Sequence, residues 1–488
     1  MKDPIQQRNP MTDLASSRST AESDVASIVS SVVAQARHTF DSGRTKPYAW
    51  REAQLKALRE LLIDNHDEIA QALEADLGKS AEEFWLTEMG LVVSEIDHTL
   101  KHLRRWLAPR RVSVPLRVQP GQARIVREPL GVVLIIAPWN YPVLLTLGPL
   151  VGVLAAGNAA VVKPSEVAPA TSAVIARLMA QHLDPEAVHV VEGGVPETTA
   201  LLTERFDHIF YTGNGVVGRI VLEAAARHLT PVTLELGGKS PTFVDDGVDL
   251  ETTARRIVWG KFTNAGQTCV APDYVLGTRQ TLDALKPLLI KAIRDSYGDD
   301  PRSSDDYGRI ITARHLRRLV ELIDPSKVVT GGESDLSARY LAPTVLDDVS
   351  LDDPVMGEEI FGPVLPLVEV SGVDEAIEVI TGRDKPLALY VFTSSPDTRR
   401  RFVRDTSSGA LSFNIPLAHL AVPELPFGGV GMSGMGAYHG EFSIDLFSHA
   451  KAVLRQPLRP DATIVVRPPR TSVQRRLIDR FVFPGRRR

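Results

Sequence analysis

The sequence predicts an α/β fold with two doubly wound domains and a small β extension. Strand-like and helix-like segments alternate from about residue 132 to 228, and a second alternating block runs from about Pro241 to about Asn414. Such alternation predicts parallel sheets joined by crossover helices. The chain has 488 residues, of which 43% are hydrophobic, so it is long enough for two or three domains with large cores.

The N-terminal quarter is expected to be helical after a disordered tail. Residues 1–24 are polar and lack the apolar core of a secretory signal, which is typical of a loose tail. From about Ser27 to Trp106 the chain is densely charged and shows helical periodicity. In the stretch 54–72 the apolar residues Leu55, Leu58, Leu61, Leu62 and Ile69 share one face of a helix. This pattern predicts an outer helical layer.

The alternating blocks give a definite order of elements. Residues 112–126 alternate as in a strand, and Gly131 to Ala137 is a continuous apolar run typical of a strand buried on both faces. We expect strands at 132–136, 159–162, 189–191 and 208–211, with helices at 144–155, 170–181 and 219–228. In the second block we expect helices at 250–265 and 281–296.

One apolar stretch has the length of a membrane span. Val143 to Val162 comprises twenty mainly apolar residues, about the length that crosses a bilayer. It is interrupted by Gly148, Pro149, Gly157 and Asn158 and leads into Lys163. A buried helix followed by a buried strand explains it better, so no integral membrane span is predicted.

Composition limits the partners and the compartment. The formal net charge is −5, which gives no reason to expect nucleic acid. With a single cysteine the chain contains no internal disulfide, which fits the cytoplasm. The segment from Arg467 to Arg488 is basic and is interpreted as a solvated tail, with an amphipathic helix in peripheral contact with anionic lipid as the alternative.

The only cysteine lies in the segment Phe262 to Tyr274, F-T-N-A-G-Q-T-C-V-A-P-D-Y. A lone cysteine is more often a small buried apolar residue than a nucleophile. Gly266 and Pro272, however, indicate a tight loop in which the thiolate and a backbone N–H could both face a ligand, as in an oxyanion hole. The residues alone leave both interpretations open.

Six motifs together resemble those of the aldehyde dehydrogenase superfamily, and G-Q-T-C-V-A-P-D-Y is similar to its class 3 or fatty-aldehyde branch. In family order they are P-W-N-Y-P (138–142), K-P-S-E (163–166), F-Y-T-G-N (210–214), L-E-L-G-G-K (234–239), E-E-I-F-G-P (358–363) and P-F-G-G-V-G (426–431). The resemblance covers about Ser27 to Leu458.

The resemblance implies a thioester mechanism and three catalytic residues. Cys269 would be the nucleophile that forms a thiohemiacetal with the aldehyde. Asn140 and a backbone N–H would stabilise the oxyanion, and Glu235 would be the general base that releases the thioester. From its residues alone, Asn140 is better explained as a turn residue before Tyr141 and Pro142.

The resemblance also implies an NAD(P) site in an atypical Rossmann-like domain. Lys163 and Glu166 would contact the adenosine ribose, and Glu359 the nicotinamide ribose, while the other expected contacts are Trp139, Gly213, Asn214, Gly218 and Phe361. Glu166 would repel a 2′-phosphate and so favours NAD, although Lys163 offsets part of that repulsion. No metal site is expected.

Three of these glycine and neighbouring positions also match a second dinucleotide-binding motif. Gly213 to Gly218 reads G-x-G-x-x-G, the pattern of a phosphate-binding loop. That loop normally opens the first βαβ unit, whereas this segment follows several expected strands. We therefore interpret Gly213 and Asn214 as part of the cleft wall, and Gly218 as a position of close packing.

The substrate is expected to be a medium or long aliphatic, or an aromatic, aldehyde. The class 3 resemblance places Tyr141, Leu91, Val92 and His419 at a substrate tunnel, and most of these side chains are apolar. A histidine in such a wall is more often packed than catalytic.

The resemblance predicts these domain ranges and a homodimer. Residues 25–108 and 129–234 would form the NAD(P)-binding domain, 235–446 the catalytic domain, 109–128 and 447–470 an oligomerisation extension, and 471–488 a basic C-terminal tail. The extension would pair across a dimer interface.

Three rival functions are considered. A CoA-acylating dehydrogenase would release the thioester to CoA, but such relatives tend to lack the glutamate at Glu235. A non-catalytic protein with the same fold would be expected to have lost Cys269, Glu235 or Asn140. A simple reductase built on the glycine-rich segment would be active without Cys269.

Overall fold

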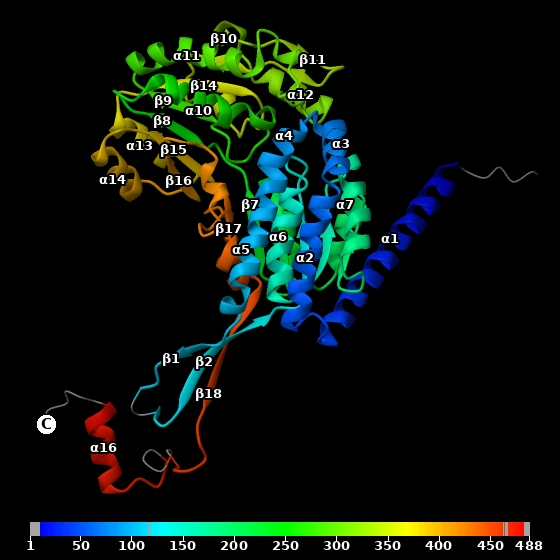
Figure 1. Cartoon of the computed structure of the whole chain (residues 1–488), viewed down its shortest axis with the longest axis vertical. Helices are drawn as coiled ribbons and strands as arrows, with labels where there is room; N and C mark the ends of the chain where they lie inside the picture. Colours follow the sequence, from blue (N-terminus) through cyan, green and yellow to red (C-terminus); the bar gives the residue numbers. More distant parts are fainter. Residues whose placement is uncertain (1–9, 116–117, 462, 464–466, 483–488) are drawn as a thin grey trace, which may run out of the picture.

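The computed structural model describes residues 10–115, 118–461, 463 and 467–482. Figure 1 shows two α/β bodies stacked on one another and a long arm that extends from the lower body. The lower body contains a six-stranded sheet, the upper body a seven-stranded sheet, and the arm a three-stranded sheet. The predicted α/β class with two domains and a β extension is confirmed.

The sheet of the lower body has the order β17-β7-β6-β3-β4-β5. Its parallel strands are β3 (Val132–Ile136), β4 (Ala159–Lys163), β5 (Val188–Val190), β6 (His208–Gly213) and β7 (Val232–Leu236), and β17 (Gly434–Met435) pairs antiparallel with β7. Every residue of β3 and β4 is buried. These two strands are covered on both faces, which is why their sequences are continuously apolar.

Helices cover both faces of this sheet. One layer consists of α2 (Tyr48–Asp64), α3 (His66–Leu77), α5 (Gly90–Trp106), α6 (Leu144–Ala156) and α7 (Pro169–His182), together with α15 (Gly440–Leu446). The other face carries α1 (Pro10–Asp41), α8 (Val195–Thr203) and α9 (Gly215–Ala226). Alternate residues of β3 belong to different cores: Val133 and Ile135 pack with the first layer, Val132 and Leu134 with the second.

The sheet of the upper body has the order β10-β13-β14-β9-β8-β15-β16. Its strands are β8 (Pro241–Val244), β9 (Tyr274–Gly277), β10 (Val328–Thr330), β13 (Thr344–Leu346), β14 (Val364–Glu369), β15 (Ala388–Phe392) and β16 (Ala410–Phe413). The helices are α10 (Leu250–Phe262), α11 (Arg279–Tyr297), α12 (Ala313–Glu321), α13 (Val373–Thr381) and α14 (Pro396–Asp405). The strands are parallel except for β10. A separate pair, β11 (Ser334–Asp335) and β12 (Tyr340–Leu341), lies outside this sheet.

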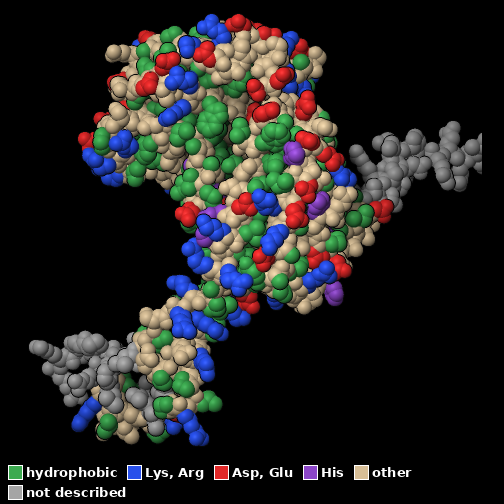
Figure 2. Space-filling model, viewed as in Figure 1, with side chains coloured by type: hydrophobic (Ala, Val, Ile, Leu, Met, Phe, Trp, Pro, Cys, Tyr) green, Lys and Arg blue, Asp and Glu red, His purple; other side chains and the backbone are tan. Residues whose placement is uncertain are grey.

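The arm is built from segments far apart in the sequence. Strands β1 (Arg110–Val112) and β18 (Ser448–Arg455) both pair antiparallel with β2 (Gln122–Pro129). Helix α16 (Ser472–Val482) lies at the far end of the arm (Figure 1). Figure 2 shows Lys and Arg side chains along the arm and mixed charges over the two bodies.

One expectation about the chain ends is wrong. Helix α1 begins at Pro10, so a loose tail over residues 1–24 is incorrect for residues 10–24, and residues 1–9 lie outside the described residues. The helix is anchored further along, where Val29, Val33 and Ala36 are buried, and such packing favours extension of the helix into the preceding segment. The basic C-terminal segment contains helix α16, as the alternative interpretation of that segment expected, while residues 483–488 lie outside the described residues.

The predicted boundary of the catalytic domain also needs correction. A boundary between residues 234 and 235 cuts through β7, which ends at Leu236. Residues 434–446, expected in the catalytic range, return to the lower body, where β17 pairs with β7 and Ile444 belongs to the core around α6. Sequence pattern misses this return because β17 has only two residues.

The apolar stretch from 143 to 162 folds as expected. It forms the thirteen-residue helix α6 and most of β4. Among the described residues, no helix is long and apolar enough to cross a membrane.

Two glycines of α6 provide a stability test. A methyl group at Gly152 would lie 2.6 Å from Ser443 Cβ, whereas at Gly148 the nearest heavy atom is Leu144 Cδ1 at 3.8 Å. We expect Gly152→Ala to lower the free energy of unfolding by about 1–3 kcal/mol through overpacking. The matched Gly148→Ala should raise it by about 0.5–1 kcal/mol, because alanine loses less backbone entropy than glycine in a helix. Urea unfolding followed by circular dichroism measures both changes, and equal effects of the two variants would contradict the packing of α6 against α15.

Candidate active site

The loop that carries Cys269 has an unusual backbone. After α10, a 3-10 turn covers Thr263–Gly266, and Asn264, Ala265 and Gly266 have φ angles of 53°, 50° and 74°. Non-glycine residues are strained in this region, and such strain persists only where the surroundings hold the chain. Here the Asn264 amide donates to Asn140 O at 2.7 Å and to Gln267 O at 3.2 Å, and all of these residues are buried. The turn directs the following segment, which carries Cys269, toward the lower body.

The facing loop of the lower body carries Asn140. This residue is 3% exposed and donates from Nδ2 to Gln267 O at 3.0 Å. An amide nitrogen has two N–H groups, so one remains for a ligand. The two loops thus exchange hydrogen bonds in both directions, and Asn140 and Cys269 line the same cavity.

A buried ion pair supports the Asn140 loop. The Lys79 and Glu88 side chains are both 0% exposed and lie 2.6 Å apart, Nζ to Oε1. Glu88 Oε2 accepts from the backbone N–H groups of Val143 and Leu144 at 2.9 and 3.1 Å, at the start of α6. Lys79 Nζ also lies 4.2 Å from the centre of the Tyr141 ring. Sequence reasoning missed this pair, because two charges in a helical region are ordinarily a solvated surface.

Glu235 lies in β7 with its carboxylate in the same cavity. The residue is 3% exposed, and among the described residues neither carboxylate oxygen has a hydrogen-bond partner. Burial therefore raises the pKa of Glu235 well above its usual value. A carboxyl group in this condition binds a proton more readily than an exposed carboxyl group does.

The Cys269 thiol shares this environment. Burial raises its pKa, and the nearby carboxyl groups of Glu359 and Glu235 raise it further. The backbone N–H groups of Cys269 and Val270 act in the opposite direction. The thiolate therefore needs the donors of this loop, or an added positive charge, to form.

Cys269 separates two cavities. One is a cleft of about 820 Å³ between the bodies, and the other is a tunnel of about 160 Å³ toward α5 and α6. Both have Cys269 and Leu145 in their walls. Two ligands could therefore reach the sulfur from opposite sides.

Most of the expected cofactor residues line the cleft. Its wall includes Trp139, Lys163, Glu166, Gly213, Asn214, Glu359 and Phe361, along with Asn140 and Glu235. Gly218 is outside this wall: a Cβ there would lie 3.1 Å from Leu236 Cδ2, so this glycine permits α9 to pack closely on β7. Asn214 caps α9 by accepting from Val217 N at 3.0 Å, so the segment is a helix start rather than a glycine-rich phosphate loop.

The charged groups of the cleft fit two ribose rings. Lys163 Nζ is held by Pro164 O at 2.7 Å and by the half-exposed Glu166 carboxylate at 3.2 Å. Glu359 Oε1 is buried without a partner among the described residues, and burial together with Asp273 raises the pKa of Glu359 to about 8. A buried acceptor without a donor fits a ligand hydroxyl.

Aromatic rings close the cleft near Cys269. The rings of Trp139 and Phe361 meet edge to face at 5.4 Å. Phe361 has a φ of 52°, and its carbonyl is hydrogen-bonded to His315 Nε2 at 2.8 Å. The strained loop is thus held from the helix α12 side, and Phe361 lines the cleft that also contains Cys269.

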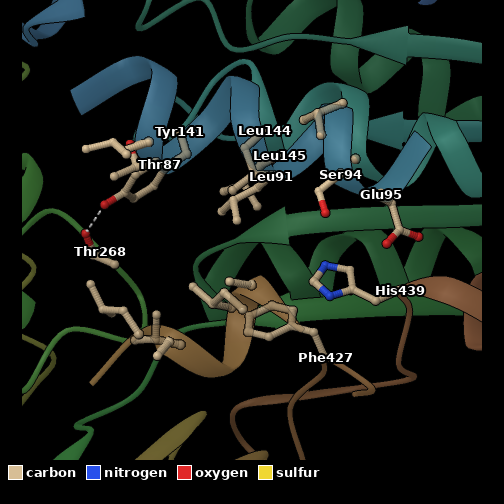
Figure 3. A pocket seen from close by; sticks show the side chains of 18 of the residues that line it. Thr87, Leu91, Ser94, Glu95, Tyr141, Leu144, Leu145, Thr268, Phe427 and His439 are labelled. Atoms are coloured by element: carbon tan, nitrogen blue, oxygen red, sulfur yellow. Dashed lines mark hydrogen bonds between the residues drawn. The ribbon is translucent and has the colours of Figure 1, made fainter. Parts of the chain in front are cut away.

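The tunnel contains three of the expected substrate residues but not the fourth. Leu91, Val92 and Tyr141 line it, and Tyr141 exchanges a hydrogen bond with Thr268 at 2.7 Å (Figure 3). His419 is not in the wall. Its ring lies between Tyr390 and Phe427, with centroid distances of 6.2 and 6.4 Å. Phe427 occupies the wall in its place, because the 3-10 turn Ala418–Ala421 directs His419 behind it.

The comparisons establish the family. The sequence model described as "Aldehyde dehydrogenase family" matches residues 2–453, and the chain belongs to the aldehyde dehydrogenase family. It is an aldehyde dehydrogenase whose curated relatives are class 3 enzymes.

Three relatives illustrate this similarity. The mouse "Aldehyde dehydrogenase, dimeric NADP-preferring" is 50% identical over 431 residues, which cover 88% of this chain and 95% of the relative. The Arabidopsis thaliana "Aldehyde dehydrogenase family 3 member H1" is 48% identical, with 93% and 94% covered. The solved "Substrate bound state of Staphylococcus Aureus AldH" superposes with a TM-score of 0.91 at 42% identity, with 93% and 99% covered.

The buried Glu359 carboxyl generates a pH prediction. Because its pKa is raised to about 8, the group is protonated below that pH and ionised above it. The ionised form accepts more hydroxyl hydrogen bonds, so we expect the KM for NAD to fall about tenfold as pH rises through about 8, the size of one charge-assisted hydrogen bond.

Steady-state kinetics between pH 6 and 9.5 measure this change. Glu359→Gln should abolish the dependence, whereas Glu358→Gln, which removes the neighbouring exposed carboxylate, should keep it. A pH dependence that survives Glu359→Gln would mean that another group controls cofactor affinity.

Proposed function

We propose that this chain oxidises aldehydes to carboxylates with NAD or NADP through a covalent thioester on Cys269. The observation that carries the proposal is the position of Cys269 between a cofactor-sized cleft and an apolar tunnel, with Asn140 and Glu235 in the cleft wall. A nucleophile, an oxyanion donor and a base therefore line the same cavity.

In the first step the Cys269 sulfur attacks the aldehyde carbon. A carbon–sulfur bond forms while the carbonyl electrons move to oxygen, and the thiol proton is released to solvent. The free N–H of the Asn140 amide and the backbone N–H of Cys269 donate to the new oxyanion. The hydrogen bond from Asn140 to Gln267 O fixes the direction of that amide.

The dinucleotide, when bound, supplies the acceptor for the hydride that leaves the thiohemiacetal. Lys163, Glu166 and Glu359, which line the cleft, would hold its ribose hydroxyls, and the Trp139 and Phe361 rings in the same wall would contact its nicotinamide. Glu166 would repel a 2′-phosphate, but the Lys163 ammonium next to it offsets part of that repulsion. The site can therefore bind NADP as well as NAD. Relatives named as NADP-preferring support this dual use.

In the last step a water attacks the thioester. Glu235 accepts one proton from that water and passes it to the sulfur as the carbon–sulfur bond breaks, which restores the thiol. The product acid then loses its remaining proton to solvent and leaves as a carboxylate. The carboxyl group suits this role because burial without a partner raises its pKa.

The tunnel favours apolar aldehydes. The wall between its ends contains Leu91, Leu144, Leu145 and Phe427 (Figure 3). Apolar walls of this kind bind medium or long aliphatic chains, or aromatic rings, by removing them from water.

We infer that the enzyme acts in the cytoplasm. Peripheral contact with lipid through the basic C-terminal segment is the alternative location.

We also infer a homodimer. The relatives named "dimeric" support it, and the arm offers β1 and β18 as edge strands of its sheet. Edge strands with unpaired backbone groups are common places for a second chain to join.

Two variants test the mechanism. Cys269→Ala should lower aldehyde oxidation by at least about a thousandfold, since the covalent step is lost. Glu235→Gln should give a burst of about one NADH per active site and then stall, because thioester hydrolysis lacks its base. Absorbance at 340 nm and the mass of the acyl-enzyme measure both effects.

The same experiment separates the rival functions. Full activity of Cys269→Ala would point to a reductase without a covalent intermediate. Rapid turnover of Glu235→Gln on addition of CoA, with acyl-CoA as product, would point to the acylating class. Binding of NAD to both variants, followed by calorimetry, controls for loss of the fold.

A further inference from the structure

The tunnel has polar groups at both ends and apolar walls between them. Figure 3 shows Tyr141 and Thr268 at one end, on the side of Cys269, and Ser94, Glu95 and His439 at the other. Leu91, Leu144, Leu145 and Phe427 lie between these ends (Figure 3). Tyr141 and Thr268 are hydrogen-bonded to each other, whereas the polar groups at the far end have no role in the proposed reaction.

Glu95 is a buried carboxyl group with unused acceptor capacity. The residue lies on α5 and is 8% exposed. Its Oε1 accepts from Gly440 N at 2.7 Å, whereas Oε2 makes no hydrogen bond and no ion pair among the described residues. Burial raises the pKa of Glu95 to about 7, and the Gly440 N–H acts against this rise. Glu95 lines the tunnel, so an acceptor without a protein donor there is available to a ligand that donates.

His439 is fixed in place on the opposite wall. Its backbone has a φ of 88°, and its N–H donates to Ser443 Oγ at 2.9 Å. The ring stacks on Phe427 at 5.7 Å and meets Tyr438 at 4.5 Å. Burial and the nearby His419 lower the pKa of His439 to about 4, so the ring is neutral at pH 7.

A neutral imidazole has one N–H donor and one acceptor nitrogen. Within the described part of the chain, neither ring nitrogen of His439 makes a hydrogen bond. The far end of the tunnel therefore holds a carboxyl acceptor and an imidazole that can both donate and accept.

We propose that this end is a subsite for a hydroxyl group at the end of the substrate chain, so that the preferred substrates are aldehydes with an apolar spacer and a terminal hydroxyl. A hydroxyl group donates to Glu95 Oε2 and accepts from the His439 ring at the same time. A terminal carboxylate would be repelled by Glu95, and a terminal methyl group would leave the acceptor unsatisfied. The proposal rests on the function proposed above, which places the aldehyde carbon at Cys269.

The experiment compares ω-hydroxyalkanals with n-alkanals of equal carbon number. For the wild type we expect kcat/KM to favour the hydroxyl-terminated aldehyde by about tenfold at one chain length, the discrimination given by one hydrogen bond to a charged group. Glu95→Gln keeps an oxygen for Gly440 N but turns an NH₂ group toward the tunnel, so the preference should fall close to one. His439→Phe should reduce it as well.

A matched control lies on the same helix. Asp97 is exposed and pairs with Arg59 outside the tunnel, so Asp97→Asn should leave the preference as in the wild type. Equal kcat/KM values for both series in the wild type would overturn the proposal. So would a hydroxyl preference that both Glu95→Gln and His439→Phe retain.

A binding measurement separates this proposal from the proposed reaction. In Cys269→Ala, calorimetry should show that α,ω-alkanediols bind about tenfold more tightly than 1-alkanols of equal length, again the effect of one hydrogen bond. If no aldehyde is oxidised but the diols still bind more tightly, the reaction is wrong and the subsite stands. Equal binding of the two alcohol series would reject the subsite, whatever the activity.

Discussion

The active site depends on the exchange of amide hydrogen bonds between two loops from different bodies. Asn140 donates to Gln267 O, and Asn264 donates back to Asn140 O. The Gln267 side chain continues this network, since it donates to Arg309 O and accepts from Ile311 N. These groups are buried, so each bond that failed to form would leave a polar atom unsatisfied in the protein interior. The network therefore permits only one relative position of Asn140 and the Cys269 loop.

The motifs recognised in the sequence have structural as well as chemical roles. Lys239, at the end of L-E-L-G-G-K, contacts Asp273 at 2.5 Å and donates to the carbonyl oxygens of Val355 and Glu358 at 2.9 Å. Asp273 in turn accepts from Ile360 N at 3.2 Å. Three motif segments are thereby tied to one another, and Glu359 is held beside Gly237, where a side chain at the glycine would clash with it.

Burial is the dominant electrostatic effect in this region. It raises the pKa values of Glu235, Glu359 and Cys269 together, because each charged form loses water without gaining a full set of partners. The Lys79 and Glu88 side chains are also fully buried, but they pair with each other, and Glu88 accepts two backbone N–H groups as well. The structure thus separates a charge pair that supports the loop from acids that keep the freedom to exchange a proton.

The sequence by itself determined the fold class, most of the strands and helices, and the family. Buried parallel strands such as β3 and β4 need continuous apolar runs, and loops such as Phe262 to Tyr274 need particular small residues, so both leave local signals. Tertiary structure alone decided that Lys79 pairs with Glu88, that Phe427 rather than His419 lines the tunnel, and that Glu95 and His439 meet at its far end. These contacts join residues from separate elements, whose side-chain directions follow from packing in three dimensions and leave no periodic trace along the chain.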